Sequence, residues 1–282
     1  MKVIRADRAG FCMGVSLALK KLETALDNRA GASRVCTLGP IIHNPQVMGR
    51  FRERGVECLE SVKDALRDDI ILIRAHGIPK NDEKILREST AKVEDATCPK
   101  VKKAQLAIAE ASERGVRLLL FGEEKHPEVR GLVSYANDDA LVFASRDELD
   151  KLDLDPDASY VLAAQTTQDR GMFQQIEEEL SRRLPRLSVL NTICDATRMR
   201  QEEARELAAK VDIMIVVGGR ESGNTRRLAD LAAEAGIRTW HVETADELEG
   251  ADIDPSLTAG LTAGASTPAD EIDAVERKLR RL

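Results

Sequence analysis

Short apolar runs alternate along this chain with longer segments whose apolar positions recur every three or four residues. The short runs predict strands over residues 35–38, 56–59, 69–73, 116–121, 160–163, 187–190, 213–217 and 257–261. The longer segments predict a helix that begins after Cys12, runs to about Asn28 and is ended by Gly31. They predict further helices over 45–55, 99–114, 197–210 and 269–282. Strands that alternate with helices indicate an α/β fold with parallel sheets.

A cysteine ends a strand-like run and opens a helical one at three places in the chain, at Cys12, Cys98 and Cys194. The spacing gives an internal period of about ninety residues. We therefore expect three pseudo-equivalent small α/β lobes that share a centre. The expected boundaries are 14–97, 98–193 and 194–282, with residues 1–13 adding a strand to the third lobe.

Polar loops follow the predicted strands at matching positions of the repeat. The first loop of each unit contains a histidine or a serine. The second loop of each unit contains a histidine, a threonine or a serine. Since the carboxyl ends of parallel strands gather ligands, we expect these loops to form one site. The residues are His43, His126 and Ser222 in the first loops, and His76, Thr166 and Ser266 in the second.

Composition narrows the class of protein. The net charge is −7 and only 3% of residues are aromatic, so the chain offers neither a basic tract nor a stacking platform for nucleic acid. No apolar run is long enough to span a membrane, and the first seven residues form a strand pattern instead of a signal peptide. Five widely spaced cysteines do not resemble a disulfide framework, so we expect a cytoplasmic protein with available thiols.

Three thiols in register with the repeat suggest a metal site. A structural zinc would require a fourth ligand, whereas an iron–sulfur cubane held by three thiolates has one iron open to substrate. Each of Cys12, Cys98 and Cys194 opens a helix, where the dipole favours thiolate. The alternative is that they are buried small hydrophobic residues, and that is the interpretation we adopt for Cys36 and Cys58.

The polar loops contain groups suited to an anion and to proton transfer. Ser222, Gly223 and Asn224 lie at a helix start and offer donors to a phosphate, although simple helix capping would use the same residues. Glu128, shielded beside a cluster, would have a raised pKa and act as a general acid with the Thr166 hydroxyl as a relay. An acidic residue in the first turn of a helix is the simpler alternative for Glu128.

These stretches together resemble a known family. AGFCMGV, GPIIHNPQV, RAHGIP, DATCPKV, KHPEVRG, AAQTTQ, ICDATRMRQ, GGRESGNTRRL and TAGASTP are similar to the motifs of the 4-hydroxy-3-methylbut-2-enyl diphosphate reductase family, in the same order from about residue 3 to 268. The resemblance implies a trefoil of three α/β lobes around a central [4Fe-4S] cluster. It also implies two-electron reductive dehydroxylation of that allylic diphosphate to isopentenyl and dimethylallyl diphosphate, the last step of the methylerythritol phosphate route to isoprenoids.

The resemblance also assigns residues. It implies that the three cysteines of the repeat bind the cluster, that Glu128 donates the proton, and that Thr166 and His126 assist near the substrate's hydroxyl. It implies that the diphosphate is bound by His43, His76, His126, Ser222, Asn224 and Ser266. The chain departs from the family at Gly223, where a second serine is usual and a backbone N–H would substitute, and at Lys125, where a glycine is common.

The expected partners are the allylic diphosphate and a small electron carrier, ferredoxin or flavodoxin, because the sequence has no glycine fingerprint for a nicotinamide or flavin. Two rival functions remain. Another three-cysteine [4Fe-4S] enzyme, similar to quinolinate synthase, would need groups for small carboxylates. A non-catalytic metal or redox sensor would have no need of Glu128.

Overall fold

The computed structural model describes residues 1–29 and 33–282, so the predicted helix terminator Gly31 lies outside the described residues. The chain forms two compact units. The C-terminal unit contains Met1–Val15, His43–Arg50 and Asp195–Leu282, and the central unit contains Ser16–Ile42 and Phe51–Cys194. No helix among the described residues is long and apolar enough to cross a membrane.

Three four-stranded sheets, all with parallel strands, make up the fold. The first consists of β3 (Val56–Leu59), β2 (Val35–Leu38), β4 (Ile70–Ile73) and β5 (Lys92–Asp95). The second consists of β7 (Leu141–Phe143), β6 (Arg117–Phe121), β8 (Tyr160–Ala164) and β9 (Leu187–Val189). The third consists of β11 (Arg238–Val242), β10 (Ile213–Val217), β12 (Thr258–Ala263) and β1 (Lys2–Arg5). The prediction of three α/β lobes with parallel sheets is confirmed.

The strand order is the same in each sheet, and a cysteine follows the fourth strand each time. Cys98 follows β5, Cys194 follows β9 and Cys12 follows β1. The fourth strand of the third sheet comes from the other end of the chain, because β1 pairs with β12 with Lys2 opposite Thr258. The sequence repeat is therefore a repeat of sheet topology.

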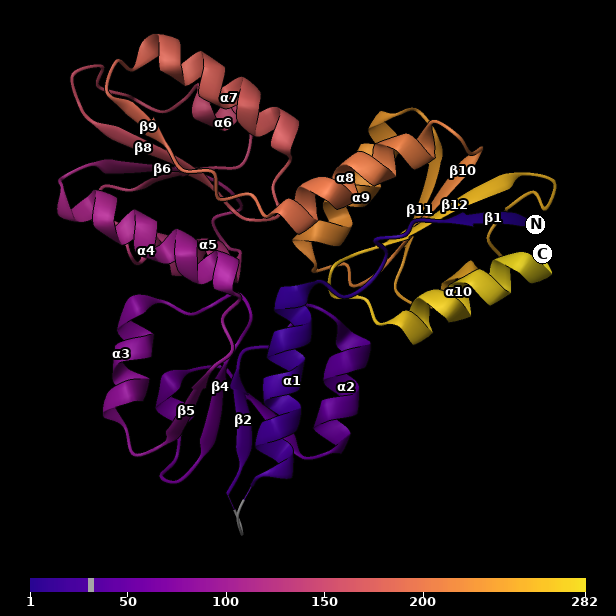
Figure 1. Ribbon diagram of the computed structural model, residues 1–282, viewed down its shortest axis with the longest axis horizontal. Coiled ribbons are helices and arrows are strands. Elements are labelled where there is room, and N and C mark those ends of the chain that lie inside the picture. Colours follow the sequence, from indigo (N-terminus) through magenta and orange to yellow (C-terminus); the bar gives the residue numbers. More distant parts are fainter. Residues whose placement is uncertain (30–32) are drawn as a thin grey trace. The chain divides into compact units, whose positions relative to one another are not determined.

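The second sheet is a central layer between two pairs of helices (Figure 1). Its one face packs against α4 (Pro99–Glu113) and α5 (Pro127–Val133), and its other face against α6 (Arg146–Leu149) and α7 (Arg170–Arg183). All five residues of β8 are buried. A strand covered on both faces needs a continuous apolar sequence, which explains the uninterrupted run that predicted it.

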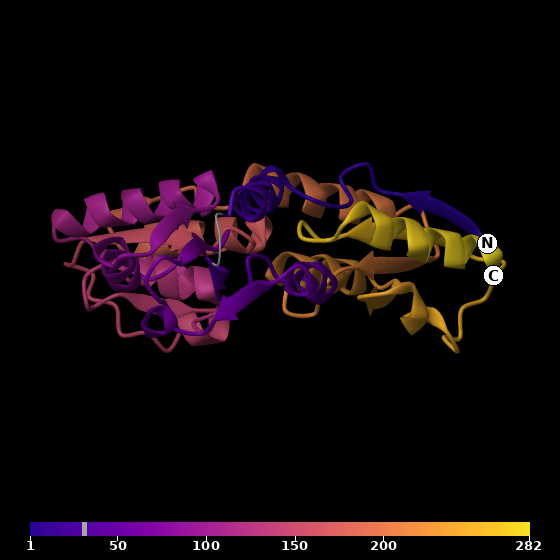
Figure 2. The same ribbon diagram turned by 90° about the horizontal axis from the view of Figure 1, so that it is seen from below.

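The third sheet is layered in the same way. Leu207 of α8 (Asp195–Ala208) and Ala232 of α9 (Gly223–Glu234) pack on one face, and α10 (Ala269–Arg281) and the short helix η2 (Ala245–Leu248) cover the other. The two chain termini lie side by side in both views (Figures 1 and 2), and the Met1 ammonium donates to the Leu279 carbonyl at 3.4 Å.

In the first sheet, α3 (Lys80–Glu88) and the short helix η1 (Val62–Asp64) cover one face. The helices α1 (Met13–Asp27) and α2 (Pro45–Glu53) begin in the C-terminal unit and end in the central unit. Figure 1 shows α3 and α1 on opposite sides of this sheet.

Most predicted elements are found within one or two residues of their expected ends. The helices α3, α6 and α7 were not predicted, and neither were the strands β7 and β11. Both are edge strands with partly exposed sequences, so they lack the apolar run of a central strand. One cysteine prediction is wrong. Cys36 is fully buried in central strand β2, as expected, whereas Cys58 is exposed because it lies on edge strand β3.

Candidate functional site

The backbone N–H of each repeat cysteine donates to the loop that follows the third strand of its own sheet. In the central unit, Cys98 donates to Ala75 at 2.9 Å and Cys194 donates to Thr166 at 3.1 Å. In the C-terminal unit, Cys12 donates to Ala265 at 3.1 Å. His76 and Ser266 directly follow two of these acceptors, so each cysteine is attached to the polar loop that the repeat matched with it.

All three repeat cysteines are thiols at helix starts with partial exposure. Cys98 is the N-cap of α4, and Cys12 and Cys194 directly precede α1 and α8. The Val15 N–H lies 3.5 Å from the Cys12 sulfur and donates to it. In contrast, burial and the nearby Asp69 carboxylate raise the pKa of Cys36 to about 11, so Cys36 is unsuited to form a thiolate.

Glu128 lies in the first turn of α5 with 2% of its surface exposed. Its two carboxyl oxygens accept from Thr166, one from the backbone N–H at 2.6 Å and one from the hydroxyl at 2.9 Å. Burial raises the pKa of Glu128 to about 7, although both hydrogen bonds from Thr166 oppose the shift. A carboxylic acid that is half protonated near neutral pH is suited to give a proton to a substrate.

Two histidines lie beside this carboxyl group in the central unit. His126 is the N-cap of α5, and its Nδ1 accepts from the backbone N–H of Glu128 at 3.1 Å. An accepting Nδ1 leaves the proton of the neutral ring on Nε2. The rings of His76 and His126 meet edge to face with centroids 5.5 Å apart. The loops of two lobes thus bring His76, His126, Glu128 and Thr166 into one region.

The C-terminal unit brings together a second group of predicted residues. The Ser266 hydroxyl donates to the His43 carbonyl at 3.1 Å and lies 3.4 Å from the Ser222 hydroxyl. Ser222 is also the N-cap of α9, where its oxygen accepts from Thr225 N–H at 3.4 Å. The capping interpretation is therefore correct, and a cap leaves the hydroxyl able to contact a ligand.

Asn224 has an unusual environment for a polar residue. It is 4% exposed, and neither its Oδ1 nor its Nδ2 has a hydrogen-bond partner within the part of the chain that the structure describes. A buried amide without partners costs about 1–3 kcal/mol, and a ligand that bonds to it would remove that cost. An anion at the start of α9, beside Gly223, would accept hydrogen bonds from the Asn224 amide and from backbone N–H groups. It would also be attracted by the positive end of the helix dipole.

Close backbone approach explains one glycine of this loop. A Cβ on Gly219 would lie 2.7 Å from the carbonyl oxygen of His43, which is the same oxygen that accepts from Ser266. No side chain larger than hydrogen fits without moving His43.

Two supporting residues had no signal in the sequence. Arg200 of α8 is buried and donates to the Gly10 carbonyl at 2.7 Å, which ties α8 to the loop before Cys12. Gln165 is buried and accepts from Glu123 N–H at 3.2 Å, which fixes the loop that precedes His126. Their partners are distant in sequence, so only the fold identifies them.

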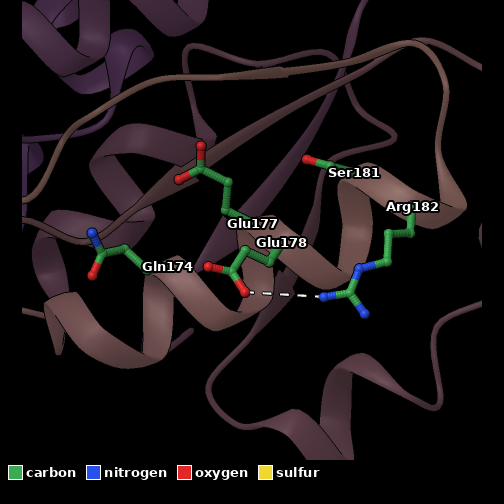
Figure 3. Close-up of a pocket in the computed structure, with 5 residues that line it drawn as sticks. All are labelled: Gln174, Glu177, Glu178, Ser181 and Arg182. Carbon is green, nitrogen blue, oxygen red and sulfur yellow. Dashed lines mark ion pairs between the residues drawn. The ribbon is translucent and has the colours of Figure 1, made fainter.

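A pocket away from these loops lies along α7 (Figure 3). It is lined by Gln174, Glu177, Glu178, Ser181 and Arg182, all from one helix. Four of the five residues are exposed, and Glu178 and Arg182 form an ion pair at 4.0 Å. Charged side chains on a solvated helix face account for this pocket.

Comparison with known proteins gives the family. The family described as "LytB protein" matches residues 3–280. The chain belongs to the LytB family. The match includes all three repeat cysteines and every polar loop described above.

LytB relatives are similar over their whole length. A 4-hydroxy-3-methylbut-2-enyl diphosphate reductase from Desulfovibrio desulfuricans is 60% identical over 286 residues, with both chains fully covered. The reductase of the same name from Nitratidesulfovibrio vulgaris (strain Miyazaki F) is 56% identical over 284 residues, again with full coverage of both chains.

Two solved structures of diphosphate reductases share the fold. The E-1-hydroxy-2-methyl-but-2-enyl-4-diphosphate reductase from Plasmodium falciparum has a TM-score of 0.90 at 25% identity, covering 98% of this chain and 87% of that one. A structure named (E)-4-hydroxy-3-methyl-but-2-enyl diphosphate reductase, the terminal enzyme of the non-mevalonate pathway, has a TM-score of 0.69 at 36% identity, with full coverage of both chains. LytB proteins are iron–sulfur proteins.

Proposed function

We propose that this LytB chain is a 4-hydroxy-3-methylbut-2-enyl diphosphate reductase that forms isopentenyl and dimethylallyl diphosphate. The observation that carries the proposal is the buried carboxyl group of Glu128, held by both donors of Thr166, next to a loop bonded to Cys194. The full-length relatives at up to 60% identity support it. A redox sensor would have no use for a buried acid of raised pKa.

The proposed cofactor is a [4Fe-4S] cluster bound by Cys12, Cys98 and Cys194, with one iron open. The donor set fits this cofactor, because these are three partly exposed thiols at helix starts and each is bonded to a site loop. When bound, the cluster would supply electrons and a Lewis-acidic iron. A reducing compartment, the cytoplasm, would keep the thiols available.

The residues of this chain would bind the substrate and move protons. Ser222, Asn224 and Ser266, with the N–H of Gly223, would hold the diphosphate at the start of α9, and His43, His76 and His126 would add donors. The unpartnered amide of Asn224 supports this assignment. Glu128 would give a proton to the departing hydroxyl, and Thr166 would orient the carboxyl group while it does so.

The lobes would correspond to residues 14–97, 98–193 and 194–282, with 1–13 supplying the fourth strand of the third sheet. The pairing of β1 with β12 supports that assignment of the first residues. Electrons would come from a small reduced carrier, ferredoxin or flavodoxin.

The test is anaerobic turnover of the reconstituted protein with the hydroxymethylbutenyl diphosphate and a reduced viologen dye. We expect substrate-dependent oxidation of the dye and formation of both five-carbon diphosphates. An intact cluster without dye oxidation would contradict the proposal and favour a dehydrating enzyme with a small-carboxylate substrate.

A further inference from the structure

An open groove lies beside α5 in the central unit, on residues to which the reaction gives no role. It has a volume of about 880 Å³. Pro79, Val133, Ala140 and Val142 give it apolar walls, and Ser134 gives it one hydroxyl. We call it the Arg130 groove, since Arg130 of α5 lines both this groove and a smaller adjoining pocket of about 250 Å³.

Cations surround the Arg130 groove. Lys125 and Arg130 line it and are both exposed. Lys80 lies next to it, because the Lys80 N–H donates to Ser134 at 2.9 Å. Among the described residues, no carboxylate forms an ion pair with any of these three cations, and the one acidic residue in the lining is Glu124.

A fourth cation faces Arg130 in the adjoining pocket. Arg74 follows β4, and its Nε donates to the Gly77 carbonyl at 3.2 Å. Burial and the charge of Arg130 lower the pKa of Arg74, while Asp82 opposes that effect. Glu60 and Asp82 also line this adjoining pocket, so they balance its two guanidinium groups. The positive charge that an acidic partner would meet therefore comes from the cations of the Arg130 groove itself.

The groove is close in the fold to one of the repeat cysteines. Arg74 begins a loop that ends at Pro79. The residue after Arg74 in this loop is Ala75, whose carbonyl accepts the N–H of Cys98 at 2.9 Å. On the other side, Lys125 directly precedes His126. Since the rate of electron transfer falls steeply with distance, a partner at this groove would be well placed to reduce a group bound to Cys98.

We propose that the Arg130 groove docks the small acidic electron carrier that drives the reaction, an inference that rests on the proposed function. In each turnover two reduced carriers would each lose one electron. The carbon–oxygen bond of the substrate's hydroxyl breaks, one proton forms a C–H bond, and the second leaves with the hydroxyl oxygen as water. Electron-transfer encounters use small interfaces, and an apolar floor with a charged rim suits such brief contact.

The test compares two electron sources in the same holoenzyme. Lys125→Glu and Arg130→Glu reverse charge at the groove, and Lys151→Glu makes the same change at an exposed lysine of the central unit that does not line the groove. With reduced flavodoxin or ferredoxin as donor, we expect each groove variant to raise the KM for the carrier about tenfold, because opposite charges steer such encounters. Turnover with reduced viologen, a small dye, should be unchanged in all three.

Ionic strength gives a second measurement. Carrier-driven kcat/KM of the natural protein should fall as salt is raised from low to physiological concentration, and that dependence should be weaker in the Arg130→Glu variant. An unchanged KM for the carrier in both groove variants would overturn the docking proposal. If the natural protein showed no turnover with the reduced dye, the proposed function itself would be contradicted. The two failures are therefore distinguishable.

Discussion

Thr166 donates twice to Glu128, through its backbone N–H at 2.6 Å and its hydroxyl at 2.9 Å, and its own carbonyl accepts the N–H of Cys194 at 3.1 Å. One threonine therefore fixes the position of a buried acid relative to one of the repeat cysteines. Every pair in this chain of contacts lies within the central unit, so the relationship is a property of that unit alone.

Replacing Glu128 with Gln should abolish most turnover. Gln has the same shape and its oxygen can still accept from Thr166 N–H, but it has no acidic proton. General acid catalysis is worth roughly 10²–10⁴-fold, so we expect kcat to fall by at least about a hundredfold with the visible spectrum of the cluster unchanged. Viologen-dependent rates and absorbance measure both effects. A variant that retains full activity would remove Glu128 from the mechanism.

The pH dependence of activity should report the same carboxyl group. With its pKa raised to about 7 by burial, Glu128 is protonated below that pH and loses its proton above it. Since the protonated form is the donor, kcat should fall as pH rises through about 7. A pH profile of kcat in the natural protein tests this, and the residual rate of Glu128→Gln should lack that limb.

The Glu128 carboxyl group should make the folded protein less stable as pH rises, whereas most acidic residues have the opposite effect. Its pKa is raised from 4.5 to about 7 on folding, so the folded state binds more protons between those values and stability falls as pH rises across them. Above pH 7 the loss amounts to about 3 kcal/mol for a shift of this size. Glu128→Gln should therefore be more stable than the natural protein at pH 8 and similar to it at pH 4.5. Urea unfolding of the metal-free chains at both pH values measures the difference.

The cysteines should separate into two classes. Serine at Cys12, Cys98 or Cys194 should reduce bound iron and the cluster's visible absorbance, because each thiol belongs to the proposed ligand set. Serine at the exposed Cys58 should leave both unchanged, and this variant is the matched control. Bound iron and visible absorbance are measured in each variant under anaerobic conditions. Full iron content in any of the first three variants would contradict the ligand assignment.

Gly219→Ala should weaken substrate binding selectively. The new Cβ would lie 2.7 Å from the His43 carbonyl and would displace the backbone to which Ser266 donates. We expect a higher KM for the diphosphate and a loss of about 1–3 kcal/mol in stability, with the cluster spectrum retained. Gly49→Ala is the control, since nothing lies within 4 Å of its Cβ. Equal KM values for the two variants would contradict the close-contact argument.

An ion network in the central unit should contribute to stability. Glu83 accepts from Lys102 and Arg87 and from the Tyr135 hydroxyl at 3.0 Å, and it therefore links α3 to α4 and to the end of α5. Its pKa is lowered because these partners outweigh the effect of burial, so the stability it adds is present above about pH 4.5 and is lost as pH falls below that value. Glu83→Gln should cost about 1–3 kcal/mol at pH 7 by urea unfolding.

The control for Glu83 is Glu88→Gln, which removes an exposed pairing with Lys84 at 3.9 Å and should cost under about 0.5 kcal/mol. Tyr135→Phe combined with Glu83→Gln should give a cost smaller than the two single changes added together. Simple additivity would show that Glu83 and Tyr135 act independently.

The sequence predicted the parts of this protein that depend on local chemistry. Buried central strands such as β10 are visible because two covered faces require a continuous apolar run, and the repeat of cysteines aligned loops that the structure places at matching sheet positions. Thr166 and Glu128 were both expected near a buried site, and the structure shows them in contact. Their assigned roles in catalysis stay predictions.

What the sequence did not reveal depends on contacts between distant segments or on weak local signals. Edge strand β11 is half exposed and has no clear apolar pattern. Glu83 and Tyr135 read as ordinary surface residues until the fold brings α3 and the end of α5 together. Cys58 lies in a short strand pattern between Val56 and Leu59 and was expected to be buried, but its strand lies at an edge, and only the strand order shows this.

The pairing of β1 with β12 has a consequence for biosynthesis. The ribosome makes β1 before both sheets of the central unit and its neighbour β12 after them, so Cys12 cannot bond to Ala265 until β12 has been synthesised. The two sheets of the central unit can form before then. Assembly of the proposed cluster on its three cysteines would therefore follow the synthesis of β12, and β1 would have an unpaired edge for a chaperone to protect until that time.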